Sequence, residues 1–220
     1  LVSSRGLGDV YKRQPIIDFL SSIGINFFGS DPVSAGFGLF NAGGIIFMII
    51  GIGLSKMLAD KYGKRNVFGV FLFISTLFIL VFYVLSPDSI NLIFGAQIFH
   101  GFFYGITIPL LWAMIADVAD YSEWKNNRRA TAIIFSAMMV GLKLGLSIGG
   151  ALVASILGSY GYVPNSVGEQ TESAILGTKM LVSIFPSIPF LVAAALLFFY
   201  VIDKKMEEKI EQDLLKKRKS

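Results

Sequence analysis

Five long apolar runs divide this sequence, and each is long enough to cross a lipid bilayer. A helix rises 1.5 Å per residue and needs about 20 mostly apolar residues to cross roughly 30 Å of hydrocarbon. The runs that qualify cover approximately residues 34–55, 67–86, 91–116, 131–157 and 178–202. The sequence therefore predicts an all-α membrane protein with five complete spans.

The composition excludes a water-soluble fold and a nucleic-acid partner. Hydrophobic residues make up 54% of the 220 positions and charged residues 15%, and the mean hydropathy is +0.68. A soluble core of this size would need a polar exterior, which so few polar residues cannot build. The formal charge of +4 does not indicate a nucleic-acid surface, because most basic residues fall beside apolar runs, in 56–65, 125–129 and 204–219. The sequence has no cysteine, which excludes disulfides and thiol chemistry.

The first 29 residues do not form a complete span. Residues 1–14 are polar and basic without periodicity, and they resemble translated sequencing adapter, so we expect a non-native or disordered leader. Residues 15–29 are apolar but short, which predicts the end of a sixth span of a longer protein. Asp18 lies there either near a membrane surface or at a functional position inside the membrane. The expected organisation is a leader, a six-helix transmembrane bundle (15–202) and a basic tail (203–220).

The connections between the spans predict their orientation. Lys and Arg in short loops stay on the cytoplasmic side. Loops 56–66 and 117–130 are basic, whereas the three intervening connections contain no Lys or Arg. The tail from residue 203 is basic again and is expected as a polar helix at the membrane surface. The sequence thus predicts a multi-pass protein of the cell membrane with a cytoplasmic C-terminus.

Lys143 is the most informative charged residue within a span. It lies near the middle of the run 131–157, roughly 20 Å from each end along the helix axis. A charge at that depth costs at least ~2.5–3.5 kcal/mol, so it usually faces a cavity or a partner. A lysine tolerated through local deformation of the bilayer is the alternative. Because this topology assigns no acid securely to that depth, we expect the partner on a missing N-terminal half, with the site between the two bundles.

Charges of opposite sign meet at the predicted cytoplasmic end of the run 91–116. We expect the acids to pair with nearby basic residues and to form a cytoplasmic gate. Exposed pairs contribute only about 0–1 kcal/mol each, which favours a switching role over a role in stability. The candidate gate residues are Asp117, Asp120, Glu123, Arg65, Arg128 and Arg129.

Small and polar residues within the spans give a weaker signal. Gly141, Gly145 and Gly149 stack on one helix face, which favours close helix packing or, alternatively, hinging. Polar or amphipathic side chains within spans could line a sugar path or form interhelical hydrogen bonds; they are Asn41, Gln97, His100 and Trp112.

One segment resembles a known family. The run from Trp112 to Lys125, Trp-Ala-Met-Ile-Ala-Asp-Val-Ala-Asp-Tyr-Ser-Glu-Trp-Lys, is similar to the cytoplasmic loop of the glycoside-pentoside-hexuronide:cation symporters, the melibiose carrier family. The resemblance continues through Arg128-Arg129, the spacing from Ser136 to Lys143, and Gly161-Tyr162-Val163-Pro164-Asn165. The segment 60–65 is similar to the preceding cytoplasmic loop, and the resemblance covers about 30–202.

The resemblance implies a major facilitator fold of twelve helices, of which this chain would supply helices seven (partial) to twelve. It implies symport of a sugar or glycoside with Na⁺ or H⁺, without a cofactor and without a metal site in this chain. Lys143 matches a membrane lysine near a cation site on the N-terminal half, and we expect it close to Trp112 as part of the substrate or coupling region. The residues Met138, Met139 and Val140 are more apolar than in the melibiose carrier, which leaves the sugar open.

Three other functions remain open. A related transporter could carry a lysophospholipid or another amphiphile through a Met- and Phe-rich interior. An intramembrane transferase would need acidic metal ligands, for which Asp117 and Asp120 share a helix face. No enzyme motif supports that reading, so we expect no enzyme. A purely structural membrane protein leaves Lys143 unexplained. The expected partners are the lipid bilayer, a sugar and the missing N-terminal half.

Overall fold

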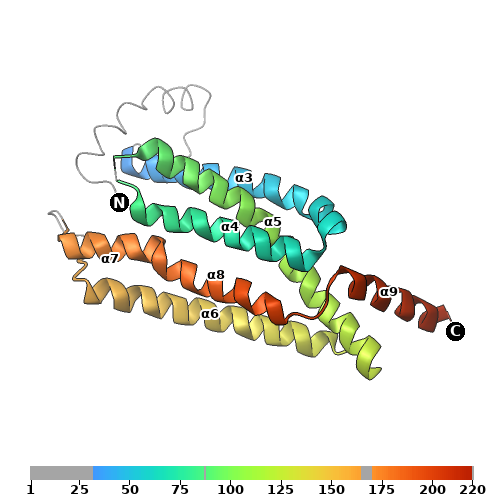
Figure 1. Cartoon of the computed structure of the whole chain (residues 1–220). Coiled ribbons are helices and arrows are strands. Elements are labelled where there is room, and N and C mark those ends of the chain that lie inside the picture. The colour runs from blue at the N-terminus through green and yellow to red at the C-terminus, as the bar shows by residue number, and fades with distance from the viewer. Residues whose placement is uncertain (1–31, 87, 165–169, 220) are drawn as a thin grey trace.

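The computed structural model describes residues 32–86, 88–164 and 170–219, and these residues form helices without any strand. The leader, the short segment 15–29 and Asp18 lie outside the described residues. Figure 1 shows the helices running side by side, with the last one beyond the end of the bundle. The helices are α3 (Pro32–Tyr62), α4 (Lys64–Val84), α5 (Ile90–Asn126), α6 (Thr131–Ser159), α7 (Glu172–Val182), α8 (Ile184–Leu196), the 3₁₀ turn η1 (Leu197–Phe199) and α9 (Lys204–Lys219).

Five helical segments are long and apolar enough to cross a membrane. This confirms the predicted all-α membrane fold with five complete spans. The segments are Gly36–Tyr62, Lys64–Val84, Ile90–Asn126, Thr131–Ser159 and Glu172–Phe199.

Two helices continue beyond the apolar runs that predicted them. Helix α3 ends at Tyr62, where Gly63 takes a φ of 84°, a conformation that favours glycine. Helix α5 continues ten residues past 116, so most of the expected loop 117–130 is helical. It ends where Asn127 adopts the left-handed conformation with φ 55°, which asparagine tolerates better than most residues.

The last span is divided at Ser183 into α7 and α8. Ser183 has φ −128° and ψ −74°, outside the helical region. Pro186 follows three residues later and has no N–H to donate to the carbonyl of Val182, so one helical hydrogen bond is missing at the division. The hydroxyl of Ser183 donates to the carbonyl of Lys179, in place of the Ser183 N–H, which donates to the carbonyl of Met180. The sequence had indicated one continuous span over 178–202.

Glycines bring α5 into direct backbone contact with α3. A Cβ at Gly101 would overlap the carbonyl oxygen of Gly44, and a Cβ at Gly105 would overlap that of Met48. From the other side, a Cβ at Gly51 would overlap the carbonyl oxygen of Phe102. Helix α5 also packs against α4, and α8 packs on α4. These close contacts hold α3, α4 and α5 as one packed unit.

Helix α6 is the least covered helix of the bundle. None of its residues is buried by the rest of the described chain. No described atom lies within 4 Å of a Cβ placed at Gly141, Gly145 or Gly149. Helix packing therefore accounts for Gly51 of α3 and for Gly101 and Gly105 of α5, but not for these three glycines of α6 among the residues described.

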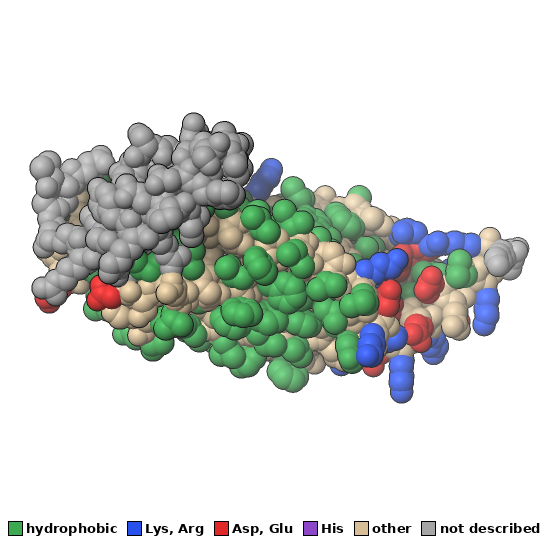
Figure 2. Space-filling model, turned by 90° about the horizontal axis from the view of Figure 1, so that it is seen from above, with side chains coloured by type: hydrophobic (Ala, Val, Ile, Leu, Met, Phe, Trp, Pro, Cys, Tyr) green, Lys and Arg blue, Asp and Glu red, His purple; other side chains and the backbone are tan. Residues whose placement is uncertain are grey.

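Charged side chains gather at one end of the molecule. Figure 2 shows Lys, Arg, Asp and Glu concentrated at this end of the visible face, next to a broad hydrophobic surface. We call it the charged end. It is formed by the start of α4, residues 117–126 of α5 and the whole of α9.

Candidate functional site

The extension of α5 places its acids on the charged end. Asp117, Asp120 and Glu123 are spaced three residues apart, and residues at this spacing are neighbours on a helix surface. Lys64 is the first residue of α4, directly after the turn at Gly63. The turn and the α4–α5 packing bring Lys64 to the acids across 53 residues of sequence.

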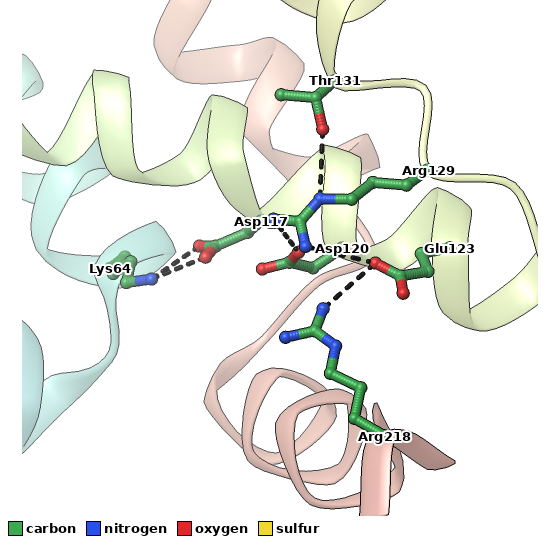
Figure 3. Close-up of polar contacts among 7 residues, drawn as sticks. All are labelled: Lys64, Asp117, Asp120, Glu123, Arg129, Thr131 and Arg218. Carbon is green, nitrogen blue, oxygen red and sulfur yellow. Dashed lines mark hydrogen bonds and ion pairs between the residues drawn. The ribbon is translucent and has the colours of Figure 1, made fainter. Parts of the chain in front are cut away.

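Lys64 binds acids from two different helices. Its ammonium Nζ lies 2.7 Å from Oδ1 and 2.8 Å from Oδ2 of Asp117, and 2.9 Å from Oε1 of Glu207 on α9. The contact with Asp117 is drawn in Figure 3. The side chains of Lys64, Asp117 and Glu207 are 23%, 15% and 32% exposed. Because they are mostly covered, solvent and salt screen these pairs less than pairs at an open surface.

Arg129 forms the second part of the network, just before α6 begins. Its guanidinium lies 3.2 Å from Asp120 and 3.4 Å from Glu123, and its Nε donates to Thr131 at 3.2 Å. Arg218, near the end of α9, lies 3.2 Å from the same Glu123 carboxylate. Figure 3 shows Arg129 and Arg218 approaching Glu123 from different segments. The pairs thus join α5 to the start of α6 and to α9.

The network contains more carboxylates than cations. Three basic groups pair with four carboxylates, so the paired set itself carries one excess negative charge, while further Lys and Arg residues lie on the same helices. A cavity of about 370 Å³ lies among several of these groups, lined by Lys64, Asp117, Asp120, Glu207, Glu211 and Arg218 with apolar residues of α9. The four carboxylates are Asp117, Asp120, Glu123 and Glu207, and the cations are Lys64, Arg129 and Arg218.

Two of the predicted gate arginines take other places. The Arg65 guanidinium donates to the backbone carbonyl of Tyr200 at 2.9 Å. Arg128 is exposed and forms no ion pair with a residue that the structure describes, while its carbonyl accepts from Ser122 at 3.0 Å. The structure therefore brings Arg129 to the acids and leaves Arg65 and Arg128 away from them.

Sequence reasoning missed Lys64, Glu207 and Arg218. Two of these residues lie on α9, which the sequence indicated as a helix at the membrane surface. The signal that could have identified its docking is an apolar stripe of residues four apart: Met206, Ile210 and Leu214.

Helix α9 packs on the extension of α5 through an apolar cluster. Ile202, Ile210 and Leu214 are buried there, with side chains packed around them from Val118, Tyr121, Trp124, Tyr200 and Met206. The indole Nε1 of Trp124 donates to Asp213 at 3.0 Å. The cluster and this hydrogen bond fix α9 against α5 on the charged end.

Tyr200 joins the last span to both neighbouring helices. Its hydroxyl donates to the carbonyl of Met114 at 3.2 Å, while its own carbonyl accepts from Arg65. Burial is the main cause that raises the pKa of the Tyr200 phenol, and the negative charges of Asp117 and Glu207 raise it further. Tyr200 therefore remains a neutral hydrogen-bond donor under ordinary conditions.

Lys143 and Trp112 do not meet the charged network. Lys143 lies on α6 and is exposed, and it forms no hydrogen bond or ion pair with any described residue. Trp112 lies on α5 with 40% of its surface exposed. No hydrogen bond or cation–π contact joins these two described residues.

The other polar residues within spans bond to or pack against neighbours. The Asn41 amide donates to the carbonyl of Phe37 in its own helix at 2.9 Å. Gln97 packs its side chain over Gly44. His100 Nδ1 lies 2.9 Å from the hydroxyl of Ser75, which joins α5 to α4. Among the residues described, the Asn41 contact lies within α3, and the Gln97 and His100 contacts join α5 to α3 and to α4.

The acids of the network do not gather as metal ligands. Among described residues, no group of three or more His, Asp or Glu side chains is arranged to hold a metal ion. Asp117 binds Lys64, and Asp120 binds Arg129. The geometry is that of an ion-pair network between helices.

The amino-acid sequence of this chain matches a known protein family. The family model of MFS/sugar transport proteins matches residues 19–204. A relative from Escherichia coli K12, provisionally named a glycoside/cation symporter, is 30% identical, covering 74% of this chain and 35% of the relative.

Two further relatives carry transporter names. A glucuronide carrier protein homolog of Escherichia coli K12 is 30% identical over 78% of this chain and 38% of its own length. An isoprimeverose transporter of Lactiplantibacillus pentosus is 29% identical over 90% of this chain and 41% of its own. The chain thus spans well under half the length of these three relatives. The family match covers most of the chain, and the chain belongs to the family of MFS/sugar transport proteins.

Proposed function

We propose that this chain is the C-terminal half of a secondary transporter that moves a sugar or glycoside together with a cation, Na⁺ or H⁺. The names of the relatives support sugar transport and symport, and the five apolar spans supply the membrane domain. The partial coverage of the relatives supports a longer protein with a second half. The charged end faces the cytoplasm in this proposal, because Lys and Arg of short loops stay inside.

The ion-pair network forms the cytoplasmic gate of the transporter. The observation that carries this role is the excess of one carboxylate in a network that joins α4, α5 and α9 and reaches the start of α6. The cavity beside the network is lined by more acids (Asp117, Asp120, Glu207 and Glu211) than cations (Lys64 and Arg218), and this local excess of negative charge attracts a basic group of the other half. Closing and opening of this contact would admit and release substrate, as in transporters that alternate access between two bundles.

Lys143 and Trp112 belong to the substrate or coupling region. Both lie on helices of the bundle with outward-facing surface, and Lys143 carries a charge without a described partner near the middle of α6. Such a charge is tolerated where another bundle supplies an acid or a wet cavity. The coupling cation would then bind on the other half, close to Lys143.

Reconstituted vesicles test the transport function. The longer transporter is purified, reconstituted and given labelled glycosides with an imposed Na⁺ gradient, an imposed H⁺ gradient or neither. Accumulation of a glycoside against its own gradient, with one cation gradient only, is the expected result. If a panel of glycosides and hexuronides gives no accumulation with either gradient while a lysophospholipid is moved, the amphiphile replaces the sugar as cargo. Movement of neither substrate would reject the proposal.

A further inference from the structure

Helix α9 contributes a charge to the network at a fixed position. The carboxylate of Asp203 accepts from the backbone N–H of Met206 at 2.9 Å, which caps the start of the helix. The ammonium of Lys204 donates to the carbonyl of Asp60 at 2.6 Å, which ties the same turn to the end of α3. Glu207 lies in this first turn, so its direction toward Lys64 is set by two contacts besides its own.

The position of α9 does not depend on the ion pair of Glu207. The apolar cluster around Ile210 and Leu214 fixes the helix on α5, and Trp124 bonds to Asp213 two turns beyond Glu207. Removal of the Glu207 charge should therefore leave α9 in place. The charge can be changed without changing the architecture.

Glu207 is the carboxylate that α9 contributes to the paired network. With it, four carboxylates face three cations; without it, three carboxylates face three cations. Its carboxylate also shares the ammonium of Lys64 with Asp117, so that Lys64 neutralises Asp117 only in part. Both effects increase the negative potential around the cavity that Lys64, Asp117, Asp120 and Glu207 line.

We propose that Glu207 makes the C-terminal helix part of the cytoplasmic gate: it is a positioning residue that supplies part of the negative charge around the cavity by which the closed gate attracts a basic group of the other half. This inference rests on the proposed function and adds α9 to the gate. The interaction is electrostatic, so it weakens as salt rises, whereas a packing role of α9 would not.

The adjacent residue provides a matched control. Glu208 carries the same charge on the same helix, but its side chain is 59% exposed and its recorded ion pair is with Lys204, at 4.0 Å. Glu208→Gln changes the net charge of the protein as Glu207→Gln does. A difference between the effects of the two variants therefore depends on the position of the charge and not on the total charge of the protein.

A cysteine at position 116 reports opening of the gate. Ala116 is exposed on α5, one helical turn before Asp120 and on the same face. The sequence contains no cysteine, so Ala116→Cys is labelled uniquely once any cysteines of the other half are removed. In inside-out vesicles of the longer transporter, a membrane-impermeant maleimide reaches this position from the cytoplasmic side when the gate opens.

We expect Glu207→Gln to raise the labelling rate by roughly fivefold at low salt, the size of a mostly covered ion-pair contribution. The increase should become smaller at about 1 M salt, where the Debye length falls to about 3 Å, although the partial burial of the group keeps it from vanishing. Glu207→Asp should restore slow labelling, and Glu208→Gln should leave the rate unchanged. Equal rates for Glu207→Gln and Glu208→Gln, or an increase that is the same at low and high salt, would overturn the inference.

Failure of this inference is distinguishable from failure of the gate. If Asp120→Asn accelerates labelling while Glu207→Gln does not, the gate stands and only the role of α9 is lost. If neither variant accelerates labelling, the gate itself is rejected. The rate at which trypsin cleaves α9 should be the same in Glu207→Gln and in wild type, which would show that the helix remains docked.

Discussion

Gly105 of α5 lies against the carbonyl oxygen of Met48 in α3, with no room for a side chain between the two helices. Gly101 makes the same kind of contact with Gly44 one turn away. Backbone contact of this kind lets two membrane helices gain dispersion attraction over their whole length, in a solvent where burial of apolar surface contributes little.

A methyl group at Gly105 should therefore separate the two helices. We expect Gly105→Ala to destabilise the purified protein by about 1–3 kcal/mol, because a carbonyl oxygen cannot yield without a shift of the backbone. Gly95→Ala in the same helix is the control, since no described atom lies within 4 Å of its added Cβ. Alanine also favours helix by up to ~1 kcal/mol over glycine. Thermal unfolding in detergent should show a lower midpoint for Gly105→Ala only; equal midpoints would refute the close contact.

Docking of α9 should depend on Leu214 and not on its neighbour. Leu214 is 5% exposed in the apolar cluster, and Leu215 is 48% exposed. Loss of a buried leucine side chain typically lowers stability by about 2–5 kcal/mol. A loss of this size should be enough to undock a single peripheral helix. We expect trypsin to cleave residues 204–219 much faster in Leu214→Ala than in wild type, with Leu215→Ala unchanged. Equal cleavage of the two variants would show that α9 is held in another way.

Replacement of the membrane lysine should alter coupling and leave folding intact. Lys143→Leu removes a charge that costs at least ~2.5–3.5 kcal/mol at the bilayer centre, so the variant should insert and unfold like wild type or be more stable. Cation-dependent sugar uptake should fall by roughly tenfold, which corresponds to about 1.4 kcal/mol of lost interaction.

Lys143→Arg keeps the charge and is the matched control for this change. It should retain cation dependence better than Lys143→Leu, although the geometry of the two cations differs. Wild-type uptake with unchanged cation dependence in Lys143→Leu would show that the lysine has no role in coupling and is only tolerated in α6.

The spans could be predicted from the sequence because apolar length alone decides whether a segment can cross a bilayer. Their ends could not, since α5 continues to Asn126 through a segment whose Val118, Tyr121 and Trp124 side chains pack against α9. The division at Ser183 was also missed, although Pro186 and Pro189 lie inside the run. A proline in an apolar run shows that a hydrogen bond is lost but not whether the helix breaks.

The acids of the ion-pair network could be located from charge sign, but their partners could not. Lys64 and Arg65 are adjacent, and successive residues of a helix point about 100° apart. Only the packing of α4 against α5 decides that Lys64 meets Asp117 while Arg65 turns to Tyr200. The share of α9 in the network depends on a docking between segments far apart in sequence, which local patterns do not reveal.

The most direct test of the account is the labelling rate of a cysteine at position 116 when Asp120 loses its charge. Asp120 is 39% exposed, next to Arg129, at the edge of the network. Asp120→Asn should accelerate labelling from the cytoplasmic side severalfold, because the closed gate loses a carboxylate worth about 1 kcal/mol. Asp60→Asn, an exposed acid at the end of α3 outside the network, should have no effect. An unchanged rate in Asp120→Asn, or equal acceleration by Asp60→Asn, would contradict a gate at the charged end.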